Sequence, residues 1–192
     1  MQRMVTDLPA APDIDYAELK QTLAACKNDK ELFEAIVNAP FTYQLQVALM
    51  FLGIMVLLLV NKKTGTIDRI ALSKTELAKG TTDVSVKRFE DIKIPVDYPH
   101  NVIAQAIKTG QPQGTADWKN LFAPALNSTE ARLNQASGGI GYSAVYPLIG
   151  ARDGGGALIF SYFQYPQEIR DMQRRFMEKY SQLVTAALKN NT

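Results

Sequence analysis

Few side chains in this chain of 192 residues could act as a nucleophile, a general base or a soft metal ligand. His100 is its only histidine and Cys26 is its only cysteine. A nucleophilic triad needs a base beside the nucleophile, most often histidine, and no recognisable partner motif surrounds His100. A histidine at the start of a helix more often caps the helix or lies on the surface. A single cysteine excludes an internal disulfide and a cysteine-based metal cluster. The sequence therefore predicts no catalytic residue, no metal site and no enzymatic activity.

The glycine-rich stretches lack the context of a phosphate-binding loop. Such a loop opens a helix, whereas residues 138–141 precede an apolar run and residues 154–156 lie in a predicted turn. The net charge is +2, and no run of lysine and arginine indicates a nucleic-acid surface. We therefore expect no nucleic-acid partner, and the sequence identifies no cofactor.

Composition is that of a folded globular protein. Hydrophobic residues make up 46% of the chain and charged residues 21%. A chain of this length can bury a substantial core. No series of positive, apolar and cleavage-site residues forms a secretory signal, so we expect a cytoplasmic protein.

Residues 141–163 hold the clearest structural pattern, two apolar runs separated by a turn. The turn at 150–156 contains four glycines and one aspartate, which tolerate positive φ, and the runs are rich in β-branched and aromatic residues. This pattern predicts a β-hairpin. Neither face of the hairpin is clearly polar, and a sheet that is apolar on both faces is covered on both faces.

Further helix and strand patterns precede and follow this hairpin. Asp15 and Asn28 each begin the spacing of a capping box, so each predicts a helix, and Pro40 is expected to end the second one. Asn127 opens a third capping box, and Pro166 predicts the start of a long last helix. The other patterns predict a helix at 101–108 capped by Gly110 and strands at 54–60, 66–73, 91–96 and 112–115. Residues 74–90 are expected to form a loop with room for one helical turn, and residues 117–126 a loop.

The strand predicted over residues 66–73 follows an alternation with a period of two. Together with the strand at 54–60 and the turn at 61–65 it predicts a second hairpin. The alternation places Ile67, Arg69 and Ala71 on one face and Asp68, Ile70 and Leu72 on the other.

Residues 41–60 allow two interpretations. The apolar run at 47–60 is shorter than the about 20 residues that a membrane helix needs, and extension back to residue 41 includes Gln44 and Gln46. We favour a buried helix over 42–52 that leads into the strand at 54–60, which predicts no membrane contact and solubility without detergent. A membrane-anchored sensor that uses residues 41–60 is the alternative.

The order and spacing of these patterns resemble the GAF family of sensory domains. The hairpin at 54–73 is similar to the first hairpin of the family, and NVIAQAIKTGQPQGTAD at 101–117 is similar to its middle helix and the short strand after it. AVYPLI at 144–149 and the run at 155–163 resemble its apolar strand and return strand. The resemblance covers roughly residues 29–189. We accordingly divide the chain into a helical extension at 1–28 and a GAF-like domain at 29–192.

This resemblance implies an α/β (α+β) fold with a central six-stranded antiparallel sheet. The terminal helices would lie on one face, and lid helices and loops would enclose a small-molecule pocket on the other. The ligands known for the family do not match this chain. Bilin-binding members attach the pigment through a cysteine, usually beside a histidine in the lid region, and no cysteine follows Cys26. Haem-binding members need an axial histidine, and nothing around His100 supports that role.

Two more classes of the family also differ from this chain. The scattered Asn-Lys-Phe-Asp-Glu signature of cyclic-nucleotide-binding members cannot be laid over this chain with sensible spacing. GAF-fold enzymes that reduce free methionine sulfoxide depend on cysteines in the pocket region, whereas Cys26 lies in the N-terminal helix. We interpret Cys26 as a small buried hydrophobic residue. The ligand therefore remains unidentified.

Aromatic side chains on the sheet and the lid are the candidates for the wall of such a pocket. Tyrosine and tryptophan combine an apolar body with one polar group, which suits a mostly apolar ligand site. Plain core packing is the alternative for each, and Asp117 could anchor a ligand or simply cap a turn. The candidates are Asp117, Trp118, Phe122, Tyr142, Tyr146, Phe160 and Tyr162.

The function that we expect is small-molecule sensing or regulation in signal transduction, through ligand binding and contact with a signalling protein and without catalysis. A structural interaction module whose own side chains fill the pocket is the alternative. The apolar stripe of the last helix, at 169–188, is wide enough to contact the sheet and a second helix together. Pairing of terminal helices would give a homodimer, whereas the chain's own helices at 16–23 or 32–37 would satisfy the stripe in a monomer.

Overall fold

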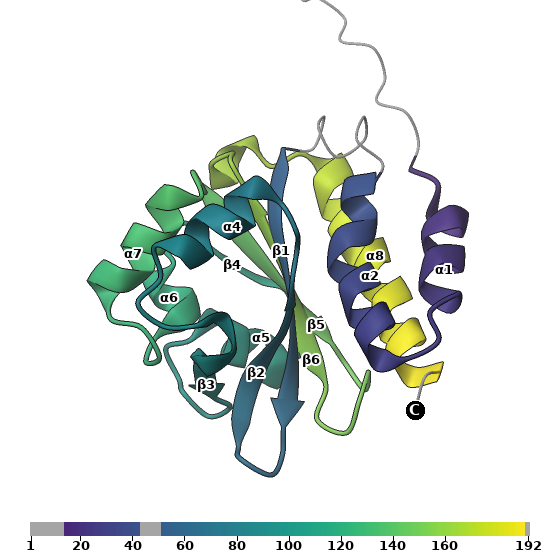
Figure 1. Cartoon of the computed structure of the whole chain (residues 1–192), viewed down its shortest axis with the longest axis horizontal. Helices are drawn as coiled ribbons and strands as arrows, with labels where there is room; N and C mark the ends of the chain where they lie inside the picture. Colours follow the sequence, from purple (N-terminus) through teal and green to yellow (C-terminus); the bar gives the residue numbers. More distant parts are fainter. Residues whose placement is uncertain (1–13, 43–50, 191–192) are drawn as a thin grey trace, which may run out of the picture.

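The computed structural model describes residues 14–42 and 51–190, which form a six-stranded sheet between two layers of helices (Figure 1). The strand order is β3-β2-β1-β6-β5-β4, and every neighbouring pair is antiparallel. The predicted fold class is confirmed. The strands are β1 (Leu52–Asn61), β2 (Thr66–Leu72), β3 (Lys93–Pro95), β4 (Gln113–Thr115), β5 (Tyr142–Leu148) and β6 (Gly156–Tyr162).

The central strands are apolar because helices cover both faces of the sheet. β1 pairs with β6 so that Leu57 lies opposite Leu158, and the side chains of β1 enter two separate cores. Met55 and Leu57 belong to the core under the terminal helices, whereas Ile54 and Val56 belong to the core on the other face. The cover predicted for both faces is therefore confirmed.

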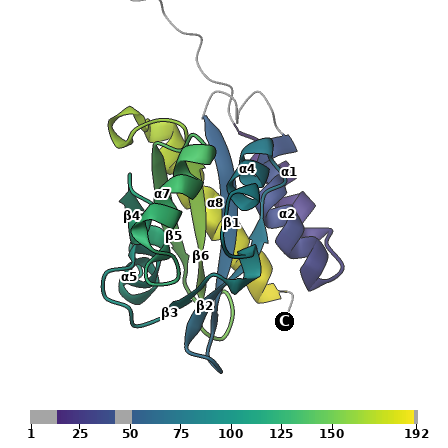
Figure 2. The ribbon, with the colours of Figure 1, turned by 60° about the vertical axis from the view of Figure 1, so that its left-hand side comes forward.

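Helices α1 (Tyr16–Ala24), α2 (Asp29–Thr42) and α8 (Asp171–Asn190) cover one face of the sheet (Figure 1, Figure 2). The Asp15 carboxylate accepts hydrogen bonds from the backbone N–H groups of Ala17 and Glu18, donors that the first turn of α1 cannot use itself. Asn28 accepts in the same way from the N–H of Glu31. Both predicted helix starts are confirmed, and the predicted domain boundary falls between α1 and α2.

Two helix boundaries differ from the prediction. α2 continues through Pro40, because the carbonyl of Ile36, to which Pro40 cannot donate, accepts a hydrogen bond from the hydroxyl of Tyr180 (2.7 Å). At the other end, the predicted long helix does not begin at Pro166. That residue starts only the short 3₁₀ helix η2 (Pro166–Glu168), which ends where the backbone of Ile169 becomes extended. α8 begins after it.

The opposite face of the sheet carries shorter helices, which we call the lid (Figure 2). Asn127 and Glu130 form the predicted capping box, and Gly110 closes its helix with the predicted left-handed backbone, at a φ of 68°. Helices also occur in the two segments predicted as loops: residues 74–90 contain more helix than the single turn that was expected, and the loop predicted over 117–126 is wrong. The lid consists of α4 (Glu76–Asp83), the 3₁₀ helix η1 (Phe89–Asp91), α5 (Val102–Thr109), α6 (Lys119–Phe122) and α7 (Ser128–Ser137).

α4 forms although its sequence favours helix weakly. Gly80 and two threonines lie within it, and these residue types have low helix propensity. Thr75 caps the helix by accepting a hydrogen bond from the N–H of Ala78 (3.2 Å). Ala78 and Thr81 are buried beneath it. Capping and packing therefore outweigh the local propensity.

A β-bulge changes the predicted alternation of β2. The register against β1 shifts between Leu57, which lies opposite Ala71, and Leu58, which lies opposite Arg69. The bulge inserts Ile70, and both Ile70 and Ala71 contact the core under the terminal helices. Ala71 therefore lies on the face opposite to the predicted one, whereas Arg69 lies beneath the lid.

The structure decides between the two interpretations of residues 41–60. Residues 52–60 belong to β1 at the centre of the sheet, so the segment is not one membrane-crossing helix. The helix predicted over 42–52 falls mostly on residues 43–50, outside the described residues. In the described part of the chain, no helix combines the length and the hydropathy that crossing a bilayer requires.

Candidate functional site

The seven predicted site residues lie on both faces of the sheet and do not line a common cavity. Trp118 and Phe122 belong to the core under the lid, where their rings meet edge to face with centroids 5.3 Å apart. Asp117 precedes Trp118. The other four belong to the core under the terminal helices or pack against it, namely Tyr142, Tyr146, Phe160 and Tyr162.

The helix-side aromatic residues pack as a hydrophobic core. The ring of Phe160 meets that of Tyr146 edge to face at 5.7 Å and that of Phe176 at 6.1 Å. Tyr162 is fully buried, and its hydroxyl has no hydrogen-bond partner among the described residues. Burial raises the pKa of Tyr162 well above its usual value. These contacts are those of core packing, the alternative that the sequence left open.

Tyr146 also borders a surface groove between α8 and the end of β5. The groove is open to solvent, has a volume of about 640 Å³ and includes Glu178 and Gln182. The buried hydroxyl of Ser181 lines it and has no partner among the residues that the structure describes. An unpaired neutral hydroxyl costs less free energy than an unpaired buried charge. The groove is therefore a weaker candidate than the site under the lid.

The lid covers the charged side chain of Arg69 from β2. Its guanidinium carbon lies 4.1 Å from the ring centre of Phe89 and 5.1 Å from that of Phe122. Part of the side chain remains accessible, but its Nε is buried without a hydrogen-bond partner. No acidic side chain in the described residues forms an ion pair with it. Burial lowers the pKa of Arg69 to about 9, so the group remains positively charged at neutral pH.

A small cavity adjoins this guanidinium, and we call it the Arg69 cavity. Its volume is about 10 Å³, room for about one water molecule. Asn134 of α7 donates a hydrogen bond to the Ser85 hydroxyl in its wall (3.2 Å), and the Lys87 ammonium donates to the carbonyl of Ala125 (2.5 Å). The wall combines two cations, hydrogen-bonding groups and aromatic rings. It consists of Arg69, Thr81, Thr82, Ser85, Lys87, Phe89, Trp118, Phe122 and Asn134.

Trp118 links this cavity to a buried pair of serines on the sheet. Its Nε1 donates to the hydroxyl of Ser143 (2.8 Å), which shares a second hydrogen bond with the hydroxyl of Ser161 (2.8 Å). Both serines are buried and lie opposite each other in β5 and β6. The hydrogen-bonded chain is neutral and fixes the orientation of the indole.

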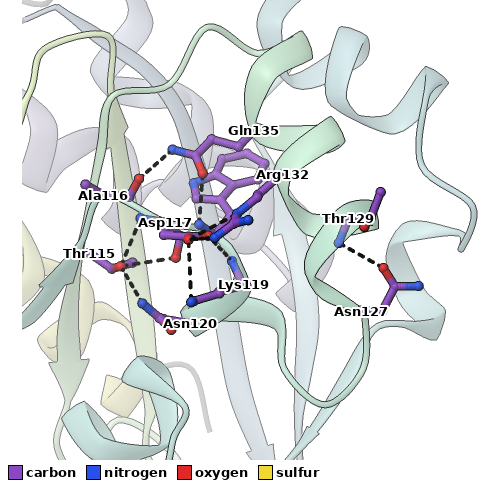
Figure 3. A network of polar contacts seen from close by, with 10 residues as sticks. Thr115, Ala116, Asp117, Lys119, Asn120, Asn127, Thr129, Arg132 and Gln135 are labelled. Atoms are coloured by element: carbon purple, nitrogen blue, oxygen red, sulfur yellow. Dashed lines mark hydrogen bonds and ion pairs between the residues drawn. The ribbon is translucent and has the colours of Figure 1, made fainter.

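A polar network holds the segment that carries Trp118 (Figure 3). Gln135 of α7 accepts a hydrogen bond from the backbone N–H of Trp118 and donates one to the carbonyl of Ala116, each 2.9 Å long. The hydroxyl of Thr115, at the end of β4, accepts from the N–H of Asp117 (3.0 Å). These contacts position the indole between α7 and the sheet.

Asp117 acts as a turn cap in this network, one of the two interpretations of the sequence. One carboxylate oxygen accepts from the N–H of Lys119 (3.0 Å), and the other accepts from the guanidinium of Arg132 (2.8 Å; Figure 3). The hydrogen bond from Arg132 is the main reason that the pKa of Asp117 is lowered. Asp117 is thus engaged by Arg132 and does not neutralise Arg69.

Sequence reasoning placed Arg69 in a strand but did not identify it as a site residue. The available signal was its position two residues after Ile67, which is buried. An arginine on the buried face of a strand points into the interior. The segment that supplies Thr81, Ser85 and Lys87 was predicted as a loop, so the sequence could not bring these side chains to Arg69.

The only histidine and the only cysteine of the chain, His100 and Cys26, do not belong to the core under the lid. His100 is exposed, and its ring meets that of Tyr98 edge to face at 6.2 Å. Cys26 follows α1 and packs against the core under the terminal helices. Burial, with a smaller effect of Glu31, raises the pKa of its thiol, which disfavours the reactive thiolate. Within the described ranges, no three histidine, cysteine or acidic side chains are grouped to hold a metal ion.

Comparison with known proteins identifies the fold. No family model matches the chain, and no curated protein matches its sequence. The GAF domain of a phosphoenolpyruvate-protein phosphotransferase from Acinetobacter has a TM-score of 0.60 at 7% identity, over 91% of this chain and 90% of that one. The chain has the GAF fold. Part of a methyl-accepting chemotaxis protein is similar to it, with a TM-score of 0.59 at 9% identity over 90% and 96% of the two chains.

The same comparison contradicts the prediction that the chain is not an enzyme. Free methionine-R-sulfoxide reductase from Neisseria meningitidis, solved in complex with its substrate, has a TM-score of 0.57 at 11% identity, over 91% of this chain and 86% of that one. The prediction rested on the scarcity of histidine and cysteine and on the absence of known pocket residues. The GAF fold carries catalysis in this neighbour, so the fold does not exclude an enzyme.

Proposed function

We propose that this chain is a regulatory domain that binds a small molecule beneath its lid. The observation that carries the proposal is the enclosed guanidinium of Arg69, which has no anionic partner in the described residues. An unpaired buried charge lowers the stability of a folded protein. A ligand that pairs with this charge would recover that free energy and stabilise the bound state.

Two structural neighbours support a regulatory role by analogy. One is a domain of a phosphotransferase and the other is part of a chemotaxis protein. Fold analogy alone does not assign a function. It agrees here with a site whose occupancy can change the position of the lid, and we propose that a cytoplasmic signalling partner reads this change.

Ligand entry requires movement of the lid, because the Arg69 cavity holds about 10 Å³, whereas ligand pockets usually measure about 300–1,000 Å³. The part of the lid that we expect to move is the segment between α4 and η1. Single hydrogen bonds tie it to the rest of the lid, from Asn134 to Ser85 and from Lys87 to Ala125. The neutral bond from Asn134 stabilises by only about 0.5–1.5 kcal/mol, and the bond from the charged Lys87 ammonium by about 1.5–3 kcal/mol at most. Opening this segment would expose Arg69 together with Trp118 and Phe122, two of the predicted site residues.

A second candidate function is a protein interaction module whose own side chains fill the pocket. The small volume of the Arg69 cavity and the close contact of Trp118 with Phe122 favour it. In that case the rings of Phe89 and Phe122 would hold Arg69 permanently, and no small molecule would enter.

Native mass spectrometry of the protein purified from its own source tests these alternatives. The sensor predicts a mass above that of the 21.3 kDa chain that returns to it after denaturation, through loss of a small molecule. Trp118 is the only tryptophan, so its indole N–H resonance and its fluorescence report on the lid without a label. Re-addition of the released compound should shift both signals. A protein that contains no ligand, and whose indole signal is unchanged by a metabolite extract, would be an interaction module.

Homodimerisation through the terminal helices is part of the proposal. The chain's own α1 and α2 pack against α8 and meet much of its wide apolar stripe, so that stripe no longer argues for a dimer. What supports pairing is a crevice of about 170 Å³ between α1 and α8, lined by Leu23, Leu183 and Ala187. Light scattering at micromolar concentration should give twice 21.3 kDa, and Leu183→Lys should give the monomer mass. A monomer in both proteins contradicts the dimer.

A further inference from the structure

We propose that the molecule bound beneath the lid carries an oxyanion, a carboxylate or a phosphate, that pairs with Arg69. This inference rests on the proposed ligand-sensing function and names the chemical class of its ligand. The neighbouring rings of Phe89 and Phe122 indicate that the oxyanion belongs to a small organic molecule with an apolar body.

The Nε donor of Arg69, which is unpaired among the described residues, is the main evidence that the ligand carries an oxyanion. A guanidinium has five N–H donors in a planar fork that fits a carboxylate or a phosphate. Phe89 and Phe122 attract the cation through their ring faces but offer no conventional acceptor. The Nε donor is buried and unpaired. An acceptor that enters from the cavity would satisfy the donors and the charge at once.

The surroundings of Arg69 favour an anion over a neutral molecule. Lys87 supplies a second cation to the cavity wall, and Thr82, Ser85 and Asn134 supply hydroxyl and amide groups. None of the side chains that line this cavity is acidic. The site therefore presents donors and positive charge, and charge-assisted hydrogen bonds to an oxyanion are about twice as strong as neutral ones.

Two acidic groups on the neighbouring lid segments already have other partners. Asp91 pairs with Arg88 at 2.8 Å, and Asp117 pairs with Arg132 at 2.8 Å. Arg88 and Arg132 thus have the anionic partners that Arg69 lacks in the described part of the chain. A ligand oxyanion is the group that completes this pattern.

The competing account is that Arg69 only clamps the lid to the sheet through Phe89 and Phe122. In the ligand-free protein, Arg69→Met loses the contacts with Phe89 and Phe122 but also removes a buried charge that is unpaired in the described residues. These two effects on stability oppose each other, so stability alone does not separate the accounts. They differ in whether an added anion changes the resonance of the Arg69 Nε–H group. Because this measurement uses the unaltered protein, it does not depend on whether a variant folds.

The experiment is an NMR titration of the ¹⁵N-labelled full chain with benzoate, with phenyl phosphate and with benzamide, which has the shape of benzoate without its charge. The Nε–H signal of Arg69 is identified by its loss in Arg69→Lys. We expect benzoate or phenyl phosphate to shift this signal and the Trp118 indole signal, and benzamide to leave the Nε–H signal in place. The stronger of the two anions identifies the carboxylate or the phosphate as the preferred group.

Variants then test the assignment. Arg69→Met should weaken binding of the effective anion by about 30-fold or more, the effect of removing one partner of a buried charge pair. The matched control is Arg88→Met, since Arg88 directly precedes Phe89 of the lid but is exposed and paired with Asp91. This control should change the affinity by less than about twofold.

Two results would overturn the inference in distinguishable ways. If benzamide shifts the Trp118 indole as strongly as both anions, and Arg69→Met binds it equally well, a ligand site exists but does not select an oxyanion. If none of the three probes and no co-purified compound shifts the indole, both the inference and the proposed function fail, and Arg69 is a structural clamp.

Discussion

The hydroxyl of Tyr180 in α8 donates a hydrogen bond to the backbone carbonyl of Ile36 in α2 (2.7 Å). In an uninterrupted helix the N–H of residue 40 would bond that carbonyl, but residue 40 is a proline. Tyr180 and Ile36 are fully buried, so bulk water does not reach the carbonyl to replace the missing donor. A tyrosine far along the chain thus satisfies an acceptor that Pro40 leaves open and joins α2 to the last helix.

Tyr180→Phe should destabilise the protein by about 1–3 kcal/mol, because it leaves this buried carbonyl unsatisfied. The stacked contact of its ring with Phe176, at 5.4 Å between centroids, would remain. Urea unfolding followed by far-UV circular dichroism measures the difference. An unchanged free energy of unfolding would show that the carbonyl does not depend on Tyr180.

Pro40→Ala provides the matched test of the same relationship. Alanine supplies the N–H that proline lacks, so the Ile36 carbonyl gains its regular helical donor. Tyr180→Phe should therefore be less destabilising in the Pro40→Ala background than in the original protein. Equal costs in the two backgrounds, measured as a double-mutant cycle, would contradict the proposed coupling.

Unlike Tyr180→Phe, Tyr162→Phe should not lower the free energy of unfolding. The Tyr162 hydroxyl is buried without a partner in the described residues, so its removal eliminates an unpaired polar group and leaves the ring in place. We expect an unchanged or slightly higher free energy of unfolding, measured in the same urea series. A clear loss of stability would reveal a hydrogen bond to the Tyr162 hydroxyl that the described residues do not supply.

Most of the sheet could be predicted from the sequence because its signals are local. The glycine-rich turn at 150–156 and the turn at 61–65 each lie between two apolar runs, and both hairpins form as expected. The caps at Asp15, Asn28 and Asn127 likewise act within a few residues of their own position. Such patterns do not depend on distant parts of the chain.

The features that the sequence did not reveal depend on distant contacts. α2 passes through Pro40 because Tyr180 compensates, and no local pattern contains that information. The bulge at Ile70 is set by the pairing of β2 with β1, so simple alternation misplaces Ala71. The candidate site was missed for the same reason, since Arg69 meets Phe89 and Phe122 only after the lid has folded onto the sheet.

The predicted site residues were chosen by type, and type does not fix the face of the sheet. Tyr162 is followed by an exposed Phe163. The alternation of side chains along β6 places Phe160 and Tyr162 on one face of the sheet and Phe163 on the other. It does not say which of the two faces lies under the lid. That assignment requires the positions of α1, α2 and α8 on the sheet.

Phe160→Ala should cost about 3–5 kcal/mol of unfolding free energy, because truncation of a buried aromatic side chain loses its packing and leaves a cavity. Phe160 is fully buried and contacts Tyr146 and Phe176. Tyr142→Ala should cost less, since Tyr142 is only half-buried. Thermal and urea unfolding compare the two variants. A melting temperature unchanged by both would show that these rings are not part of the core.

Acidification should remove a contribution that Asp117 makes to stability at neutral pH. Arg132 lowers the pKa of Asp117 in the folded protein, so the contribution is fully present above the unfolded pKa of about 3.9. It is lost as the pH falls through the lower folded pKa. Asp117→Asn keeps an acceptor for the N–H of Lys119 but removes the charge that pairs with Arg132.

At pH 7 we expect Asp117→Asn to be less stable than the original protein by about 1 kcal/mol or less, because the Arg132 side chain is largely exposed and the pair is screened by solvent. At about pH 2.5, below the unfolded pKa, the difference should be smaller than at pH 7, because the contribution is lost as the pH falls toward and through the lowered folded pKa. Urea unfolding at the two pH values measures it, and Arg132→Gln is the control that should reduce the effect of Asp117→Asn at pH 7. If the difference grows on acidification, or persists in the Arg132→Gln background, the ion pair is not the source of the stability that Asp117 contributes.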